Sequence, residues 1–470
     1  MQEQAASVRK IIYGLDDRPP PVRAGVLGLQ HVLTMFGSTV AVPLIFGPVL
    51  WPIPEGLPDQ VTGRLLEMQL GNTALLISSV MLCSGIATFL QVTFGSRLPI
   101  IQGISFSFLA AFFGIVASTQ TVAAPDWSAV LAGDVRPETL QPLIAAWQDA
   151  GALGMRTIAG AVLLGGILEA VVGFTGLMGL IRRVLSPVVI GPVIMLIGLA
   201  LYQFGAPVAA QHWGISLLTM ALIILFSLVL SRWIRLFQLF PLLSAIVIVV
   251  TFCWWLGTKG IFQAGDAAYV DLSAFQRSDW VRLRTVFFPW GLPEFGLAAV
   301  VAVLAGYLAS MVESFGDYHA CKNLAGGGDP TPKEISRGIG FEGIGCSLTG
   351  LLGGFSSTSY SENIGLVGLT KVGSRFVVQI AAVILILLGL FGKFGALAAA
   401  IPKPVVGGLY CALFGLIAAV GVRQFAKADL NSDRNLFIGG FALFMGLSLP
   451  YWFQSAEGAA TIQMLRVTFS

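Results

Sequence analysis

Charged residues are scarce in this sequence. Asp, Glu, Lys and Arg together make up 11% of the 470 residues, whereas an ordinary soluble domain has roughly 25%. This scarcity excludes a water-soluble globule, because too few polar side chains are available to cover its surface. The sequence instead has 56% hydrophobic residues, gathered in apolar windows of about 20 residues that are typical of membrane-spanning helices. The composition predicts an all-α, multi-span membrane protein.

Histidine and paired cysteines are also lacking. The three histidines are scattered, no HExxH motif is present, and the five cysteines form no CxxC pair. These absences exclude a HExxH metalloprotease and argue against the Ser–His pair of an intramembrane serine protease. We therefore expect no enzyme activity, no metal centre and no cofactor. The net charge of +3 is carried by loops and gives no reason to expect a nucleic-acid partner.

Thirteen apolar segments are predicted to span the membrane. They cover residues 24–47, 69–93, 98–118, 156–178, 184–204, 213–231, 236–256, 294–318, 337–352, 354–371, 376–398, 402–422 and 435–452. The first 23 residues are polar, so we expect a cytoplasmic arm there rather than a cleavable signal peptide. The positive-inside rule supports this orientation. The inner loops would carry Arg97, Arg182, Arg183, Arg232, Arg235, Lys322, Lys333, Arg337, Lys371, Arg375, Arg423, Lys427 and Arg434.

An internal repeat is visible in the apolar segments. The motif Pro-Val-Val-Ile-Gly at 187–191 precedes one apolar run, and Pro-Val-Val-Gly-Gly at 404–408 precedes another. Gly198 and Gly415 match at the same spacing from these motifs. The two motifs open the fifth and twelfth predicted spans, so the repeating unit has seven spans. An odd number of spans inverts the second copy, which predicts inverted-topology repeats.

Acidic residues occur at membrane depth in the second repeat. Glu313 and Asp317 lie four residues apart and would share one helix face. Glu362 follows a stretch rich in Gly and Ser, and Glu342 is close in sequence. A charged group at the bilayer centre costs a few kcal/mol even on lenient scales, so such acids indicate a functional site. For Glu342 the alternative is a first-turn acid stabilised by the dipole of the ninth span.

Two spans look interrupted. The third begins LPIIQGISFSF at residue 98, and the tenth begins GGFSSTSYSEN at residue 353. Each has an extended lead containing Ser and Gly, followed by a helix, and they occupy corresponding places in the two repeats. Irregular backbone at this depth must be buried in protein or line a cavity. We therefore expect the two extended pieces to pair and to expose two helix N-termini to a ligand.

These motifs resemble the nucleobase–ascorbate transporter family, the nucleobase:cation symporters of the second type. The resemblance covers nearly the whole chain. It is carried by Gln30-His31 in LQHVLTMFGSTVAVP, by Glu313-Ser-Phe-Gly-Asp317, and by Glu362-Asn363-Ile-Gly365 with the following residues through Arg375. It implies a fold of seven plus seven inverted spans, divided into a core domain and a gate domain, with short extended segments in spans three and ten.

The resemblance also implies domain boundaries. The core would be residues 24–178 and 294–398, the gate 179–256 and 399–470, with a cytoplasmic arm at 1–23 and an extracellular loop at 257–293. A homodimer formed through the gate is expected, in the plasma (cell inner) membrane. Only thirteen spans are found, so the fourteenth is expected to be missing or incomplete in this chain.

Site residues follow from the resemblance position by position. Glu313 and Glu362 would bind the edges of a nucleobase, with backbone groups near Phe106 and Ser361 and the ring of Phe106 completing the contacts. Ser105 and Asn363 would support this set. Cation coupling would involve Asp317, Glu342, His31 and Gln30. A site that needs one acid neutral and another ionised can couple transport to a proton without a metal.

The substrate and the coupling ion stay open at this stage. Family members that accept ascorbate usually have Pro where this chain has Glu362, uracil carriers have Glu, and purine carriers have Asp at the position of Asp317. Uracil and a xanthine-like oxopurine are therefore both candidates. Sodium is the alternative to the proton, since carboxylates and hydroxyls could hold it. An anion carrier or exchanger with the same inverted-repeat plan is the remaining alternative.

Overall fold

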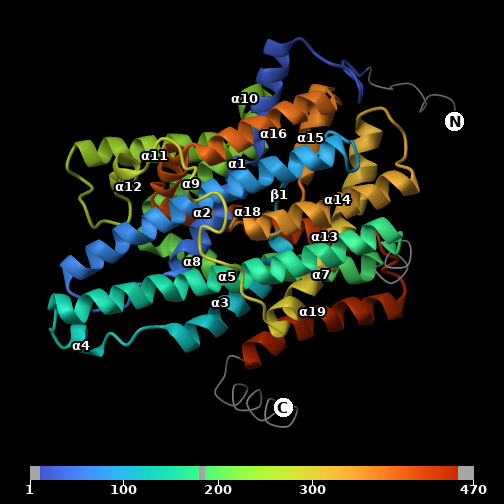
Figure 1. The fold of residues 1–470 in the computed structure, drawn as a ribbon. Coiled ribbons are helices and arrows are strands. Elements are labelled where there is room, and N and C mark those ends of the chain that lie inside the picture. The colour runs from blue at the N-terminus through green and yellow to red at the C-terminus, as the bar shows by residue number, and fades with distance from the viewer. Residues whose placement is uncertain (1–10, 179–185, 454–470) are drawn as a thin grey trace, which may run out of the picture.

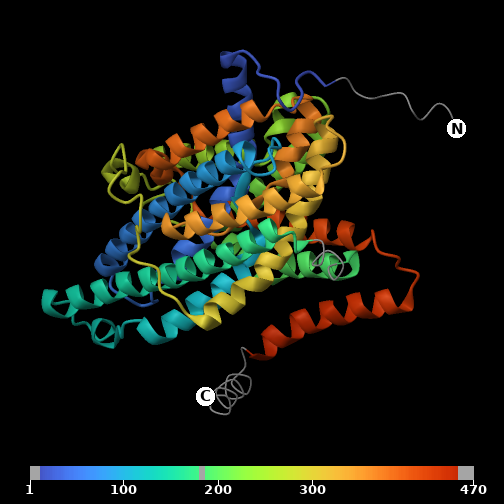
Figure 2. The same ribbon diagram turned by 45° about the vertical axis from the view of Figure 1, so that its right-hand side comes forward.

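The computed structural model describes residues 11–178 and 186–453 as a bundle of long helices (Figures 1 and 2). Within these residues, nine helices are long and apolar enough to cross a membrane. The predictions for residues 1–10, for Arg182 and Arg183, and for a fourteenth span after residue 453 lie outside the described residues.

The elements have the following bounds. The α-helices are α1 (Pro21–Leu50), α2 (Asp59–Thr93), α3 (Leu109–Ala123), α4 (Ser128–Leu131), α5 (Pro137–Thr175), α7 (Pro187–Ala200), α8 (Tyr202–Ala209), α9 (Trp213–Ile224), α10 (Arg235–Leu239), α11 (Pro241–Thr258), α12 (Ser273–Arg277), α13 (Leu297–Leu324), α14 (Pro332–Leu351), α15 (Ser361–Thr370), α16 (Arg375–Leu390), α17 (Gly392–Ala399), α18 (Lys403–Phe425) and α19 (Asp433–Phe453). The strands are β1 (Gln102–Ile104) and β2 (Ser357–Ser359). Short 3₁₀ or π turns are η1 (Phe106–Phe108), η2 (Ala210–His212), η3 (Leu225–Val229) and η4 (Leu230–Arg232).

Each of the thirteen predicted segments contains a helix, but the ends of several differ from the prediction. Much of the predicted loop 119–155 is helical, because α5 begins at Pro137. Proline is favoured in the first helical turn, where no N–H is needed. Asp134 accepts hydrogen bonds from the backbone and side chain of Arg136, which lower the pKa of its carboxyl below the usual value. The predicted span 376–398 is broken at Phe391, where the backbone forms a bridge with Val281.

The two predicted extended pieces do pair. β1 and β2 form a two-stranded antiparallel sheet, in which Gln102 lies opposite Ser359 and Ile104 opposite Ser357. All six residues of the pair are buried. Because the strands satisfy one another's backbone groups, this irregular segment is tolerated in the apolar interior. Gly103 allows the close approach, since a Cβ there would lie 2.5 Å from the Tyr360 ring.

The repeated Pro-Val-Val motifs open two helices that pack against each other. Pro187 begins α7, and Pro404 lies in the first turn of α18. A Cβ on Gly191 would lie 2.5 Å from Phe425, and one on Gly421 would lie 2.4 Å from the backbone nitrogen of Met195. The start of α7 thus meets the end of α18, and the two helices run in opposite directions along their contact. This antiparallel contact is the arrangement that an inverted repeat produces.

Glycines also bring α5 and α14 into backbone contact. A Cβ on Gly173 would lie 2.2 Å from the backbone nitrogen of Gly340, and one on Gly343 would lie 2.3 Å from that of Ala170. Small residues at a membrane-helix interface permit such close packing. Van der Waals contacts then hold the helices together, because the hydrophobic effect does not drive association of helices inside a lipid bilayer. The outermost described helix, α19, packs against α7 at the edge of the bundle (Figure 2).

Replacing Gly343 by Ala tests the α5–α14 contact. We expect Gly343→Ala to lower stability by about 1–3 kcal/mol, because a methyl group has no space there. The matched control is Gly71→Ala in α2, where nothing lies within 4 Å of an added Cβ. We expect this control to be neutral or stabilising by about 0.5–1 kcal/mol. Thermal unfolding of the purified variants gives the comparison, and equal melting temperatures would contradict the packing account.

Candidate functional site

A cavity of about 290 Å³ lies where the β1–β2 pair meets the first turns of η1 and α15. Glu313 of α13 and Glu362 of α15 both line it. The other lining residues come from the strand ends and from α7 and α18: Ile104, Ser105, Phe106, Ser107, Thr358, Ser359, Tyr360, Ser361, Ile194, Ile197, Leu413, Leu416, Ile417, Val420 and Arg423. Six residues were predicted to bind the substrate, and Asn363 does not line this cavity. The other five line it: Glu313, Glu362, Phe106, Ser105 and Ser361.

Both strands turn into a helix at this cavity. After β1, the Ser105 hydroxyl accepts a hydrogen bond from the backbone N–H of Ser107 at 3.3 Å. After β2, α15 begins at Ser361 with Glu362 in its first turn. The first N–H groups of a helix have no partner within the helix and carry partial positive charge. The cavity thus combines two acids with two helix starts.

Glu362 also faces a second cavity of about 480 Å³. Its walls come from α1, α9, η3, α10, α11, α15 and α18 and are mainly apolar. The Ser38 hydroxyl of α1 donates a long hydrogen bond of 3.4 Å to Glu362. The carboxyl group at the start of α15 thus stands between two open spaces, whereas Glu313 lines only the smaller of these two cavities.

Asp317 is held by hydroxyl groups of the second interrupted segment. Ser359 donates a hydrogen bond to one carboxyl oxygen and Ser361 to the other, both at 2.8 Å. Asp317 is buried and lies one helical turn beyond Glu313 on α13. It therefore joins the acidic helix to the end of β2, while Glu313 remains directed to the cavity.

Glu342 is buried behind the strand pair. Its carboxyl oxygens accept hydrogen bonds from three hydroxyls of α13: Ser310 at 3.1 Å, Ser314 at 2.7 Å and Tyr318 at 2.8 Å. The alternative interpretation of Glu342 as a first-turn acid is wrong, because α14 begins at Pro332, ten residues before Glu342. The first-turn acid of α14 is Glu334, which forms a capping box with Thr331.

His31 and Asn363 form a supporting contact between α1 and α15. The Asn363 amide donates to the backbone oxygen of His31 at 2.9 Å and lies 3.2 Å from the ring nitrogen Nδ1. Both side chains are buried. Gln30 does not line either cavity described above, and its side-chain oxygen is buried without a hydrogen-bond partner among the described residues.

Several residues at the site were missed in the sequence. Arg423, expected in an inner loop, lines the smaller cavity at the end of α18. Tyr360 donates to the backbone oxygen of Ile104 at 3.0 Å and so links the two interrupted segments. Glu169 is a further buried acid, on α5. The rule that singled out Glu313 also applies to Glu169, since both lie within predicted apolar spans.

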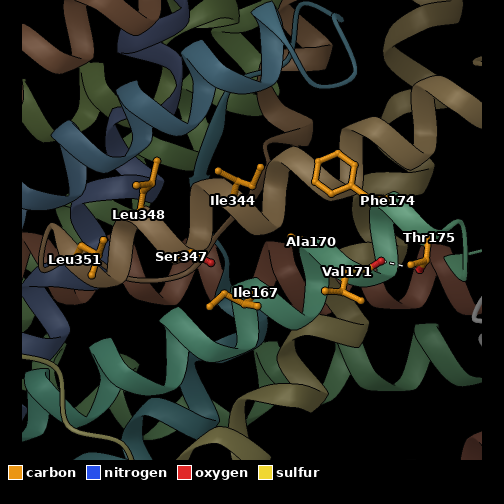
Figure 3. Close-up of a pocket in the computed structure, with 9 residues that line it drawn as sticks. All are labelled: Ile167, Ala170, Val171, Phe174, Thr175, Ile344, Ser347, Leu348 and Leu351. Atoms are coloured by element: carbon orange, nitrogen blue, oxygen red, sulfur yellow. Dashed lines mark hydrogen bonds between the residues drawn. The ribbon is translucent and has the colours of Figure 1, made fainter.

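Another surface pocket, of about 430 Å³, lies between α5 and α14 (Figure 3). Its lining is apolar apart from Thr175 and Ser347, whose hydroxyls donate to backbone carbonyls of helices α5 and α14. It offers no group for orienting a polar ligand. The acid-lined cavity is therefore the better candidate for a functional site.

Comparisons with known proteins agree with this architecture. The model of the Permease family (Xan_ur_permease) matches residues 23–455. The chain is 37% identical over 480 residues to solute carrier family 23 member 1 of Mus musculus, covering 96% of this chain and 74% of that protein. It is 32% identical over 455 residues to nucleobase-ascorbate transporter 2 of Arabidopsis thaliana, covering 94% and 79%.

Two solved structures are similar in fold. The transmembrane domain of a cyanobacterium bicarbonate transporter, BicA, has a TM-score of 0.58 at 14% identity, with 92% of this chain and 96% of that chain covered. SLC26A9 has a TM-score of 0.50 at 12% identity, with 93% and 60% covered. At these identities the likeness concerns the fold alone, and it confirms the predicted inverted-repeat transporter fold.

Removing the Ser359 hydroxyl tests its contact with Asp317. We expect Ser359→Ala to destabilise the protein by about 1–3 kcal/mol, because a buried carboxyl loses a donor that nothing replaces. Ser118→Ala is the control, since that hydroxyl donates only to Ile115 within its own helix. Thermal unfolding at neutral pH measures both. A Ser359→Ala protein as stable as the control would show that the contact carries no free energy.

Proposed function

Because this chain belongs to the nucleobase–ascorbate transporter family, we propose that it is a secondary transporter that imports a nucleobase by proton symport. Uracil or a xanthine-like oxopurine is the proposed substrate. The observation that carries this proposal is that Glu313 and Glu362 line one cavity together with the starts of two helices. Members of the family are membrane transporters and not enzymes. Family membership therefore supports membrane transport, and the substrate and the coupling ion are our proposal.

Glu313 and Glu362 are proposed to bind opposite edges of the base. A nucleobase is planar and presents ring N–H donors, and each carboxylate can accept from one of them in a short, charge-assisted hydrogen bond. Backbone N–H groups near Phe106 and Ser361 would receive the carbonyl oxygens, with the Phe106 ring against the flat face. A cavity of about 290 Å³ suits a small planar molecule. Asn363 and Ser105 would support the two helix starts.

Asp317 is proposed to couple the cation, with Glu342, His31 and Gln30 in support. Its hydrogen-bond partners Ser359 and Ser361 belong to the segment that forms the proposed base site. A change in the charge of Asp317 would therefore alter the hydrogen bonds of that segment. A proton is the preferred ion because several acids lie close together and, among the described residues, none of them forms an ion pair with a basic side chain. Sodium is the alternative, held by the same carboxylate and hydroxyls.

Alternating access is proposed to follow an elevator-like shift of the core, residues 24–178 and 294–398, against the gate, residues 179–256 and 399–470. The cavity walls support this division, because strand ends and α13 line one side and α7 and α18 the other. A homodimer through the gate, a plasma-membrane location and a cytoplasmic N-terminus complete the proposal.

An anion carrier is the second candidate. The start of α15, which has no side-chain cap, and Arg423 at the cavity are features that an anion site would use. Against it stand Glu313 and Glu362, whose charges would repel an anion in the same space.

A ligand panel tests the substrate class. Purified protein is heated with uracil, xanthine, uric acid, adenine, ascorbate, bicarbonate or sulfate at pH 6 and pH 8, with and without sodium. A ligand at 100 times its Kd stabilises the folded state by about 2.7 kcal/mol. We expect uracil or xanthine to raise the melting temperature, more strongly at pH 6 and equally with or without sodium. Stabilisation by bicarbonate or sulfate in place of any base would favour the anion carrier.

Replacing Glu362 by Gln tests its role in specificity. The amide cannot form a charge-assisted bond and offers one acceptor oxygen. We expect Glu362→Gln to weaken uracil uptake about tenfold, near 1.4 kcal/mol, and xanthine uptake less. Glu138→Gln, in the exposed first turn of α5, is the chemically matched control and should take up both bases normally. Equal loss of both bases in Glu362→Gln would remove Glu362 as the specificity residue.

A further inference from the structure

Glu169 is an acid buried between helices and outside the ligand cavity. It lies on α5 between Gly166 and Gly173, on the face that meets α14 in backbone contact. Only 1% of the residue is exposed, and neither carboxyl oxygen meets an N–H or O–H donor among the described residues. A carboxylate without donors in such a place is very unfavourable. Packing alone gives no reason for an acid rather than an apolar residue here.

The neighbours of Glu169 include a second acid. The titratable groups that face it are Glu342 and Cys346 of α14 and Tyr307 and Tyr318 of α13. Glu342 interacts with Glu169 electrostatically, and no Lys, Arg or His of the described chain is among the groups that do. The Cys346 thiol is only a weak donor, and the Tyr307 hydroxyl already donates to the Val162 carbonyl at 2.8 Å. Two negative charges so placed would have no cation to offset them.

The hydrogen bonds decide which of the two acids is ionised. Glu342 receives three hydroxyl donors, from Ser310, Ser314 and Tyr318. A carboxylate, which only accepts, suits that set. Glu169 receives none, and a protonated carboxyl loses far less on burial than a carboxylate. The surroundings therefore favour one proton and one negative charge on the pair, with the proton on Glu169.

A chain of hydroxyls leads from this pair to the candidate site. The Ser314 hydroxyl, which donates to Glu342, lies 2.9 Å from the Ser359 hydroxyl. Ser359 in turn donates to Asp317 at 2.8 Å. Every contact in this chain is within hydrogen-bond distance. A change of charge at Asp317 can therefore reach Glu342 through the hydroxyls, and Glu169 through the electrostatic interaction between the two acids.

We propose that Glu169 and Glu342 are a proton-holding pair for coupling, with Glu169 as the carboxyl that stores the proton. The inference rests on the proposed function, because it adds a coupling residue to that transport cycle. When the pair releases its proton, the O–H bond of the Glu169 carboxyl breaks and an O–H bond forms on the carboxylate of Asp317, which Ser314 and Ser359 link to Glu342. Only a proton moves, and the negative charge passes from Asp317 to the pair. Glu169 does not touch the base; it sets the charge that Glu342 presents to Ser314 and the strand pair.

Infrared spectroscopy of the purified full-length protein tests the stored proton directly. At neutral pH we expect the wild type to show the carbonyl stretch of a protonated carboxylic acid that is lost in Glu169→Gln. In Glu342→Gln that band should titrate away at lower pH, because the neighbouring negative charge is gone. Ser347→Ala, which removes a hydroxyl from the same α5–α14 interface, should keep the band and its titration unchanged.

Uptake of uracil and xanthine into proteoliposomes at pH 6 and pH 8 tests coupling. We expect Glu169→Gln to keep the thermal shift with the base but to take it up equally at both pH values, and Ser347→Ala to keep the wild-type ratio. A wild-type pH ratio in Glu169→Gln, or an infrared spectrum unchanged by that substitution, would overturn the inference. If Glu169→Gln does not fold, the infrared titration of Glu342→Gln tests the inference instead. A carboxylic acid band that is lost at the same pH as in the wild type would then overturn it. If the wild type shows the Glu169 band but takes up neither base, the proposed function fails while the protonated pair stands.

Discussion

The structure depends on forming backbone hydrogen bonds for two non-helical segments that lie inside an apolar bundle of helices. Two chain segments leave helical geometry at the centre of the molecule, and each would lose its hydrogen bonds if it stood alone. They solve this together, because β1 and β2 exchange their backbone bonds over three residue pairs. The pairing also fixes where α15 and the helix after η1 begin, and so where two helix starts face the same space. The ligand cavity is a consequence of that backbone requirement.

Hydroxyl groups meet the second constraint, which is the burial of acids without basic partners. Asp317 and Glu342 are each surrounded by Ser or Tyr hydroxyls that donate to them. Such donors stabilise a negative charge without introducing a positive one. They also adapt when the charge disappears, since a hydroxyl can rotate to accept instead. Hydroxyl groups therefore suit the proton coupling that we propose better than fixed ion pairs would.

The sequence predicted the type of fold and pointed to residues that line the candidate cavity, because both inferences rest on local patterns. Apolar windows gave the helices, the Pro-Val-Val motifs gave the inverted repeat, and the Gly- and Ser-rich leads gave the paired strands. The start of α5 was missed because its first turns are polar and extend beyond the apolar stretch. The burial of Glu342 in mid-helix was missed because the capping box at Thr331, which marks the true start of α14, was read as loop. The partners of Glu169 could not be read at all, since they come from helices far away in sequence.

The early start of α5 has a practical consequence. With 39 residues and a rise of about 1.5 Å each, the helix is about 58 Å long, whereas the hydrocarbon core of a bilayer is about 30 Å thick. Pro137 and Glu138 at its start and Gly133 in the α4–α5 connection are exposed, and nothing lies within 4 Å of a Cβ added at Gly133. The hairpin formed by α4 and the start of α5 is therefore a rigid projection to which another protein can be attached. A short epitope or a small folded partner inserted at Gly133 would serve as a fiducial for aligning single-particle images, at a position remote from the strand pair and the acids.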